Sequence, residues 1–134
     1  MKSTLVDANV LIDLFDDGSE WQEWSDAMLT ECRRRGQLVI NPIVFAEIAV
    51  GFESIDDVND VLQEDYLRRE PLPWEAAYLA GQAFKQYRRA GGERRSPLPD
   101  FYIGAHAAVA GHTLLTRDPR RYRHYFPKLR IISP

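Results

Sequence analysis

The sequence predicts a three-layer α/β fold, in which helices cover both faces of a parallel sheet. Short apolar runs of three or four residues indicate buried strands, and longer stretches with helical periodicity separate these runs. Because a helix rather than a tight turn follows each strand, the strands should pair in parallel through crossover connections. The length of 134 residues suits one domain, residues 1–134, and leaves no room for two.

The first strand and two helices are expected within the first 36 residues. Residues 4–6 are short, β-prone and apolar, and they predict a buried strand. Apolar pairs recur four residues apart in residues 10–15, as they do on one face of a helix. A second helix is expected over residues 20–35, with Trp21 and Trp24 on one side, and Gly36 is a typical helix stop.

A second strand and two more helices follow. Residues 38–40 predict the strand, and Asn41 is a typical helix cap with Pro42 at the first helical position. This helix should run over residues 43–50 and close at Gly51. Another helix is expected over residues 55–66, with its acidic residues exposed to solvent.

The second half begins with a short extended piece at residues 67–69. A long helix is expected over residues 74–89, where apolar residues recur at three- and four-residue steps. Residues 91–97 contain two glycines and a proline and predict a loop. A small-residue helix over 100–111 and a strand over 113–116 follow.

The chain should close with a turn, a short helix and a last strand. Residues 117–119 predict the turn, the short helix after them carries several arginines, and residues 129–132 predict the strand.

Composition limits the classes of protein that this chain can represent. One cysteine, Cys32, cannot form an internal disulfide, which fits a reducing cytoplasm. No apolar stretch approaches the length of a signal peptide or a membrane span, so we expect a cytoplasmic protein without a membrane partner. Residues 1–67 carry 15 acidic and 4 basic side chains, whereas residues 68–134 carry 5 acidic and 13 basic ones. This asymmetry predicts an acidic centre close to a basic surface.

Four acids are placed where an active site is expected. In an open parallel sheet, ligands bind beyond the carboxyl ends of the strands. Asp7 directly follows the first strand, Glu47 lies about one turn into the helix after the second, and Asp118 follows the strand at 113–116. Asp100 begins the helix that leads into that strand. We therefore expect these four carboxylates to meet at one edge of the sheet.

Four carboxylates in one cleft repel one another unless a cation neutralises them. Hard divalent cations with oxygen ligands, Mg²⁺ or Mn²⁺, are the natural partners of such a cluster. The predicted chemistry is the metal-assisted hydrolysis of a phosphodiester, with all four acids serving as catalytic groups and metal ligands.

Nearby polar residues are expected to support this site. Asn9 follows Asp7 by two residues, and Thr116 ends its strand, so both can orient Asp7 or a bound water. Basic residues flank Asp100 and Asp118, and we expect these cations to bind substrate phosphates on either side of the scissile bond without reading sequence: Arg94, Arg95, Arg117, Arg120 and Arg121.

Four segments resemble the motifs of PIN-domain nucleases, in the same order. Residues 5–13, LVDANVLID, resemble the opening motif, in which a strand delivers the first acid. Residues 41–48, NPIVFAEI, resemble the second motif, and residues 99–107, PDFYIGAHA, the third. Residues 114–122, LLTRDPRRY, resemble the fourth. The resemblance extends over essentially the whole chain.

Within that family, the size and the motifs look like VapC toxins of bacterial toxin–antitoxin pairs. The resemblance implies a five-stranded parallel sheet, RNA cleavage that depends on Mg²⁺ or Mn²⁺, and a homodimer. It also implies a small antitoxin protein that covers the site. The four acids fall on the family's acidic positions, and Asn9 and Thr116 on its polar positions.

Three other functions remain as alternatives. A haloacid-dehalogenase-type phosphatase would need an aspartate two residues after Asp7, where this chain has Asn9. A signalling receiver domain would need paired acids near the start and a lysine after a late strand, and the sequence has neither. A catalytically silent binding module is disfavoured by the intact acidic set.

The remaining candidates have simpler explanations. Asp13 is expected to face solvent near a helix end, and His106 to pack inside its helix interface. His112 and His124 show no partner pattern, and Cys32 should be a small buried or half-buried residue.

Overall fold

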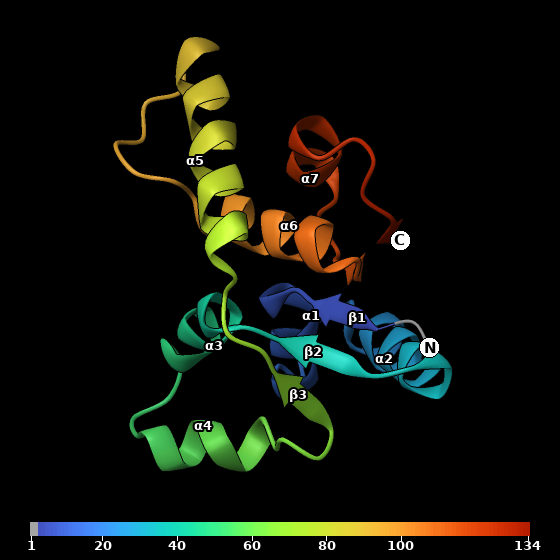
Figure 1. Ribbon diagram of the computed structural model, residues 1–134. Helices are drawn as coiled ribbons and strands as arrows, with labels where there is room; N and C mark the ends of the chain where they lie inside the picture. The colour runs from blue at the N-terminus through green and yellow to red at the C-terminus, as the bar shows by residue number, and fades with distance from the viewer. Residues whose placement is uncertain (1–2) are drawn as a thin grey trace.

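The computed structural model describes residues 3–134 and has the predicted three-layer α/β/α architecture (Figure 1). Its sheet has five strands in the order β3-β2-β1-β4-β5, and every neighbouring pair is parallel. The strands are β1 (Thr4–Val6), β2 (Leu38–Ile40), β3 (Leu67–Arg69), β4 (Thr113–Leu115) and β5 (Ile131–Ile132).

Strand β1 lies at the centre of the sheet and pairs with β2 on one side and β4 on the other. Leu5 is in register with Val39 and with Leu114. The chain builds outward from β1 to β3 on one side, and then β4 and β5 extend the other side. The strand order therefore reverses between β1 and β4, which is the point where open α/β sheets bind ligands.

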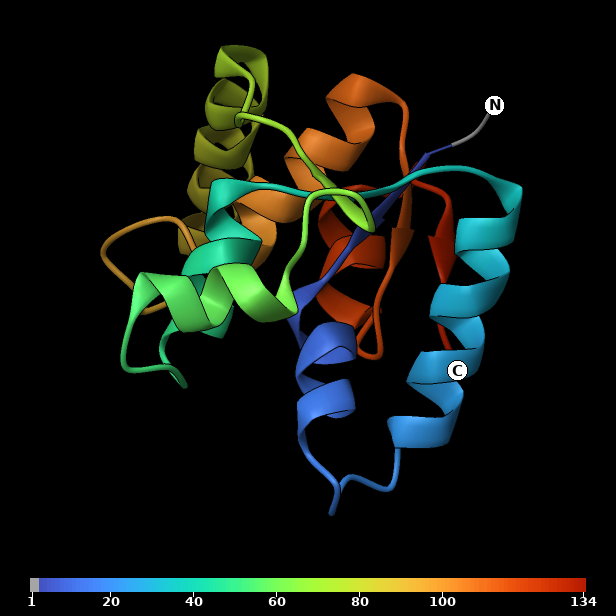
Figure 2. The same ribbon diagram turned by 90° about the horizontal axis from the view of Figure 1, so that it is seen from below.

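Seven helices surround the sheet in the described part of the chain. Helix α6 contacts β1 and β4 on one face, whereas α1 and α2 cover the opposite face (Figure 2). The main core lies between the sheet and these helices. The helices are α1 (Ala8–Phe15), α2 (Gln22–Arg35), α3 (Pro42–Ala49), α4 (Ile55–Val61), α5 (Trp74–Arg89), α6 (Pro99–Ala110) and α7 (Arg120–Tyr125).

The ends of α3 and α6 follow the predicted local chemistry. The Asn41 side chain accepts a 2.9 Å hydrogen bond from the backbone N–H of Val44, and Pro42 begins α3. Helix α6 ends at Gly111, whose φ of 75° is in the left-handed region that glycine adopts without strain. These caps fix the two helices that carry Glu47 and Asp100.

Helix α4 is shorter than the predicted 55–66, because it ends at Val61. Arg69 on the neighbouring strand β3 explains this end. Its Nη2 donates to the carbonyl of Leu62 at 3.0 Å and to Asn59 Oδ1 at 2.8 Å. The helix terminus is therefore bound by a side chain of the strand that follows it.

Helix α7 packs closely on α6 at Gly104. A Cβ atom at this position would lie 2.5 Å from the Phe126 ring and 3.0 Å from the Tyr122 ring. Gly104 thereby lets Tyr122 reach the carboxyl edge of the sheet. In the part of the chain that the structure describes, none of the helices has the length and apolar character that crossing a bilayer requires.

Candidate active site

Asp7 occupies the switch point at the end of β1, where it is only 5% exposed. Its side chain makes no capping hydrogen bond to α1, so capping does not explain the residue. Instead, Oδ2 accepts hydrogen bonds from Thr116 Oγ1 at 2.9 Å and from the Tyr122 hydroxyl at 2.8 Å. These two donors fix the rotation of a buried carboxylate.

Asn9 and Thr116 lie beside Asp7, as the sequence predicted. Asn9 Nδ2 lies 3.5 Å from Asp7 Oδ2 and 3.3 Å from Thr116 Oγ1. Asn9 Oδ1 accepts from the backbone N–H of Arg117, and Thr116 Oγ1 accepts from that of Asp118. The two side chains thus hold the loop after β4 against the end of β1.

Asp100 lies in the first turn of α6 and is joined to Asp7 through Tyr122. The Tyr122 hydroxyl, which donates to Asp7, also lies 3.4 Å from Asp100 Oδ1. Arg121 Nη1 donates to Asp100 Oδ2 at 3.0 Å. Burial and the two carboxylate charges raise the pKa of Tyr122 well above its usual range, so its hydroxyl stays a donor.

Sequence reasoning missed Tyr122 as a site residue. It lies on the arginine-bearing helix four residues after Asp118, where its neighbours Arg121 and Arg123 are exposed. The signal that the sequence offered was a tyrosine among the arginines of the short helix that follows Asp118.

Glu47 projects from α3 toward the same carboxylates. Its Oε1 is buried and has no hydrogen-bond partner. Burial, followed by the charges of Asp7 and Asp100, raises the pKa of Glu47 to about 7. A buried carboxylate oxygen without a donor, beside two further acids, is the arrangement that a bound cation would stabilise.

Asp118 differs from the other three acids because it is exposed. Its backbone N–H is bound to Thr116, so it stays on the loop next to Asp7. Its side chain lines a neighbouring pocket together with Arg120 and Arg121. The structure therefore gathers Asp7, Glu47 and Asp100 and places Asp118 at the rim.

Asp13 does not face solvent, contrary to the prediction. It is 2% exposed, and its carboxylate accepts from Ser25 Oγ at 2.6 Å and from Ser19 Oγ at 3.0 Å. Arg117 Nε donates to Asp13 Oδ2 at 2.6 Å, and the Arg117 guanidinium lies 5.8 Å from the Trp21 ring centre. Asp13 thus anchors α2 and the loop that carries Asp118.

The predicted RNA-binding arginines fall into two groups. Arg94, Arg95 and Arg120 are exposed. Arg117, which is half-buried, and Arg121, which is exposed, are paired with Asp13 and Asp100. The two paired arginines position acidic side chains, and the other three are available to a ligand.

A second cluster of potential ligand groups lies beside α6: His106 is in that helix, His112 follows its end and Glu70 follows β3. The ligand atoms of Glu70, His106 and His112 all lie within 4.8 Å of one another. Both histidine Nε2 atoms face Glu70 Oε1, at 3.2 Å from His106 and 2.7 Å from His112. His112, for which the sequence showed no partner, is therefore buried against the half-buried Glu70.

The hydrogen bonds of this cluster determine where His106 carries its proton. Because Asn41 Oδ1 accepts from Val44, its amide nitrogen faces His106 Nδ1, at 3.0 Å, and donates to it. The ring hydrogen of neutral His106 is then on Nε2, pointed at Glu70. Burial lowers the pKa of His106, which favours this neutral form. The cluster is therefore a hydrogen-bonded relay between α6 and the cap of α3.

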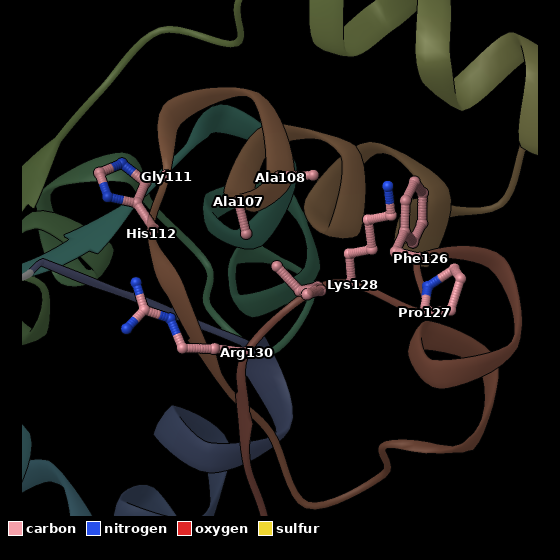
Figure 3. Close-up of a pocket in the computed structure, with 9 residues that line it drawn as sticks. Ala107, Ala108, Gly111, His112, Phe126, Pro127, Lys128 and Arg130 are labelled. Atoms are coloured by element: carbon pink, nitrogen blue, oxygen red, sulfur yellow. The ribbon is translucent and has the colours of Figure 1, made fainter.

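A cavity of about 440 Å³ lies at the C-terminal end of α6, between that helix and residues 126–130 (Figure 3). None of the four predicted acids lines this cavity. Asp100 lies at the opposite end of the same helix. The cavity is therefore separate from the carboxylate site.

A family model described as the PIN domain matches residues 4–127. The chain belongs to the PIN-domain family. The match contains all four acids at the carboxyl edge of the sheet, so the site described above belongs to this PIN domain. A comparison with curated proteins finds no match.

Solved structures share the fold of this PIN domain over nearly the whole chain. VapBC2 from Rickettsia felis, bound to a promoter DNA fragment, is 15% identical, with a TM-score of 0.75 and 98% of each chain covered. VapBC from Salmonella typhimurium, also bound to DNA, is 22% identical, with a TM-score of 0.69 and coverage of 99% of this chain and 98% of that one. VapC20 from Mycobacterium tuberculosis, described as a sarcin-ricin loop cleaving toxin, is 14% identical, with a TM-score of 0.67 and coverage of 90% and 94%.

Proposed function

We propose that this PIN domain is an endoribonuclease that uses Mg²⁺ or Mn²⁺. The observation that carries the proposal is the buried, unpartnered Oε1 of Glu47 beside Asp7 and Asp100. A polar atom in that position destabilises the fold unless a cation or donor binds it. A structural role alone offers no reason to keep three acids there.

The donor set fits a hard divalent ion, since every ligand would be a carboxylate oxygen. Asp7, Glu47 and Asp100 would hold it, with Asp118 at the rim. When bound, such an ion would stabilise charge on the attacking and leaving oxygens of a phosphodiester. Thr116, Tyr122 and Asn9 orient Asp7, and Arg121 orients Asp100.

We further propose that the protein acts in the cytoplasm as the toxin of a toxin–antitoxin pair and forms a homodimer. The shared fold with the VapBC complexes and with VapC20 supports this assignment. The partners would be an RNA substrate and a small antitoxin. RNA as the substrate is also supported by the exposed Arg94, Arg95 and Arg120.

Cleavage of total RNA in the presence of Mn²⁺ tests the enzyme assignment. We expect the native protein to cut, and Asp7→Asn and Asp100→Asn to lose at least about a hundredfold in rate, since even groups that only support a metal ligand contribute up to that much. Asp60→Asn, which removes an exposed acid of α4, is the matched control and should cut at the native rate.

Calorimetric titration with Mn²⁺ gives a second measurement that does not depend on turnover. Native protein and Asp60→Asn should bind the ion, and Asp7→Asn should bind it far more weakly. A native protein that binds Mn²⁺ but leaves RNA intact would support the silent binding module. Equal cutting by native protein and both site variants would reject the assigned active site.

A further inference from the structure

A pocket of about 390 Å³ opens beside the carboxylate site, between the C-terminal end of α5 and α7. Both helices rise from α6 on the side away from the sheet (Figure 1). The pocket is lined by aromatic and charged side chains only: Tyr87, Asp118, Arg120, Arg121, His124 and Tyr125. Its volume is within the range of about 300–1,000 Å³ that is typical of small-molecule sites.

The aromatic walls are held in place by the core residue next to Asp100. Phe101 is fully buried, and its ring lies edge-on to those of Tyr87 and Tyr125. The ring centres are 5.7 Å apart for Tyr87 and 5.0 Å apart for Tyr125. His124 in turn packs edge-on against Tyr125 at 4.6 Å. The Tyr87 and Tyr125 rings therefore pack against the residue that follows Asp100, and His124 packs against Tyr125.

The loop before α6 covers Tyr87 from another side. A Cβ atom at Gly92 would lie 2.2 Å from the Tyr87 ring, so only glycine allows the chain to pass this closely. Arg88 Nη1 donates to the carbonyl of Arg94 at 3.0 Å, which ties the loop with Arg94 and Arg95 to α5. A basic segment therefore lies next to the aromatic pocket.

Two contacts connect the pocket to the proposed catalytic acids. Asp118 is part of the lining, and Arg121 reaches from the lining to Asp100 at 3.0 Å. A group in the pocket would thus be a near neighbour of a phosphodiester at the carboxylates. Single-stranded RNA offers such a group, because its unpaired bases stack on aromatic rings and arginine planes.

We propose that this pocket binds one base of a single-stranded RNA, adjacent to the phosphodiester that is cut. The inference rests on the proposed ribonuclease function and adds a subsite to it. Tyr87, His124 and Tyr125 supply the stacking surface, and Arg120 supplies a cation for a flanking phosphate. The sequence alone did not indicate any of the three aromatic residues.

Fluorescence anisotropy with a short labelled single-stranded RNA in EDTA measures binding without cleavage. We expect Tyr87→Leu and His124→Ala to weaken binding by roughly fivefold to a hundredfold, the effect of losing one stacked base. Tyr87→Phe keeps the ring and should bind like the native protein. Tyr78→Ala removes an exposed tyrosine of the same helix outside the pocket and is the matched control.

A series of RNAs that each lack one base locates the occupant. One abasic position should weaken binding to the native protein and have little effect on Tyr87→Leu or His124→Ala, because the pocket and the base then act as a coupled pair. His124 is exposed, so His124→Ala keeps the test valid even if Tyr87→Leu fails to fold.

The outcomes separate this inference from the proposed function. The base subsite alone is overturned if the native protein cuts RNA, the pocket variants bind RNA as tightly as the native protein does, and no abasic position distinguishes them. A native protein that neither binds nor cuts RNA overturns both. Loss of RNA binding without the abasic coupling would also reject the pocket as a base site.

Discussion

At the scale of single residues, the Glu47 carboxyl group makes the stability of the fold depend on pH. Its pKa of about 7 lies above the value of 4.5 that an unperturbed glutamate has, because burial and two neighbouring acids oppose its ionisation. The folded protein therefore holds this proton at pH values where the unfolded chain has lost it. The free energy of unfolding must then fall as pH rises from about 4.5 to about 7.

We expect Glu47→Gln to remove this pH-dependent loss of stability in the metal-free protein. The variant should match the native protein near pH 4 and be more stable above pH 7, by up to about 3 kcal/mol. Urea denaturation in EDTA across this pH range measures the difference. Adding Mg²⁺ at pH 8 should stabilise the native protein and leave Glu47→Gln nearly unchanged. A native-minus-variant difference that does not vary with pH would contradict the burial of this charge.

The Asp13 carboxylate is the second residue with a large predicted effect. It binds two serine hydroxyls and the Arg117 side chain, so Asp13→Ala leaves several polar groups without a partner. We expect a loss of about 2–3 kcal/mol in the free energy of unfolding. Asp17 is exposed and lies two residues beyond the end of α1, the helix that contains Asp13. Asp17→Ala should therefore shift stability by less than about 0.5 kcal/mol. Equal effects of the two substitutions in thermal denaturation would disprove the anchoring role.

The sequence pointed to Asp7, Glu47 and Asp100 because Asp7 follows β1, Glu47 lies in the helix after β2 and Asp100 begins the helix that leads into β4. It could not identify the roles of Asp13 and Tyr122. Both roles depend on partners more than 100 residues away along the chain: Arg117 for Asp13, and Asp7 for Tyr122. Local periodicity contains no information about such contacts.

At the scale of elements, the packing of α7 on α6 through Gly104 positions the Tyr122 hydroxyl. Gly104→Ala would force the Phe126 and Tyr122 rings away from α6. We expect a loss of about 1–3 kcal/mol in stability and reduced cleavage, since Tyr122 would no longer hold Asp7. Gly81→Ala is a matched control, because nothing lies within 4 Å of its Cβ position in α5.

The control should gain up to about 1 kcal/mol, as alanine is the better helix former. Thermal denaturation and the RNA cleavage rate measure both effects. A Gly104→Ala protein with native stability and native activity would show that α7 is not fixed by this contact.

Most elements were predictable from the sequence, and the exceptions have tertiary causes. Strands β1 and β2 and the cap at Asn41 follow directly from local residue types. The early end of α4 depends on Arg69, a residue of the adjacent strand. Strand β5 is limited to Ile131–Ile132, shorter than the predicted 129–132, as its pairing extends only along the end of β4.

At the scale of the whole molecule, charge is divided between the two halves of the chain. The net charge is −11 for residues 1–67 and +8 for residues 68–134. The exposed Arg94 and Arg95 belong to the basic half and lie in the loop before Asp100. In the proposed ribonuclease they would contact RNA phosphates on one side of the cut.

Replacing Arg94 and Arg95 with glutamine should weaken RNA binding and flatten its dependence on salt. Each lost phosphate contact lowers the slope of log K against log salt by about 0.7 for a single strand, hence by about 1.4 for two. The same change at Arg33 and Arg34, in the acidic half at the end of α2, is the control and should leave the slope unaltered. An unchanged slope in the Arg94 and Arg95 variant would remove these residues from the binding surface.

The hydrogen bonds from Asn41 through His106 to Glu70 have a consequence for how the protein responds to zinc. A histidine whose Nε2 carries hydrogen has no lone pair there to offer, and transferring that hydrogen to Nδ1 would push it against the amide hydrogens of Asn41. Zn²⁺ could bind His106 Nε2 only if Asn41 released Nδ1, and Asn41 also caps the first turn of the helix that carries Glu47. His106 is therefore poorly placed to act as a zinc ligand while Asn41 caps α3.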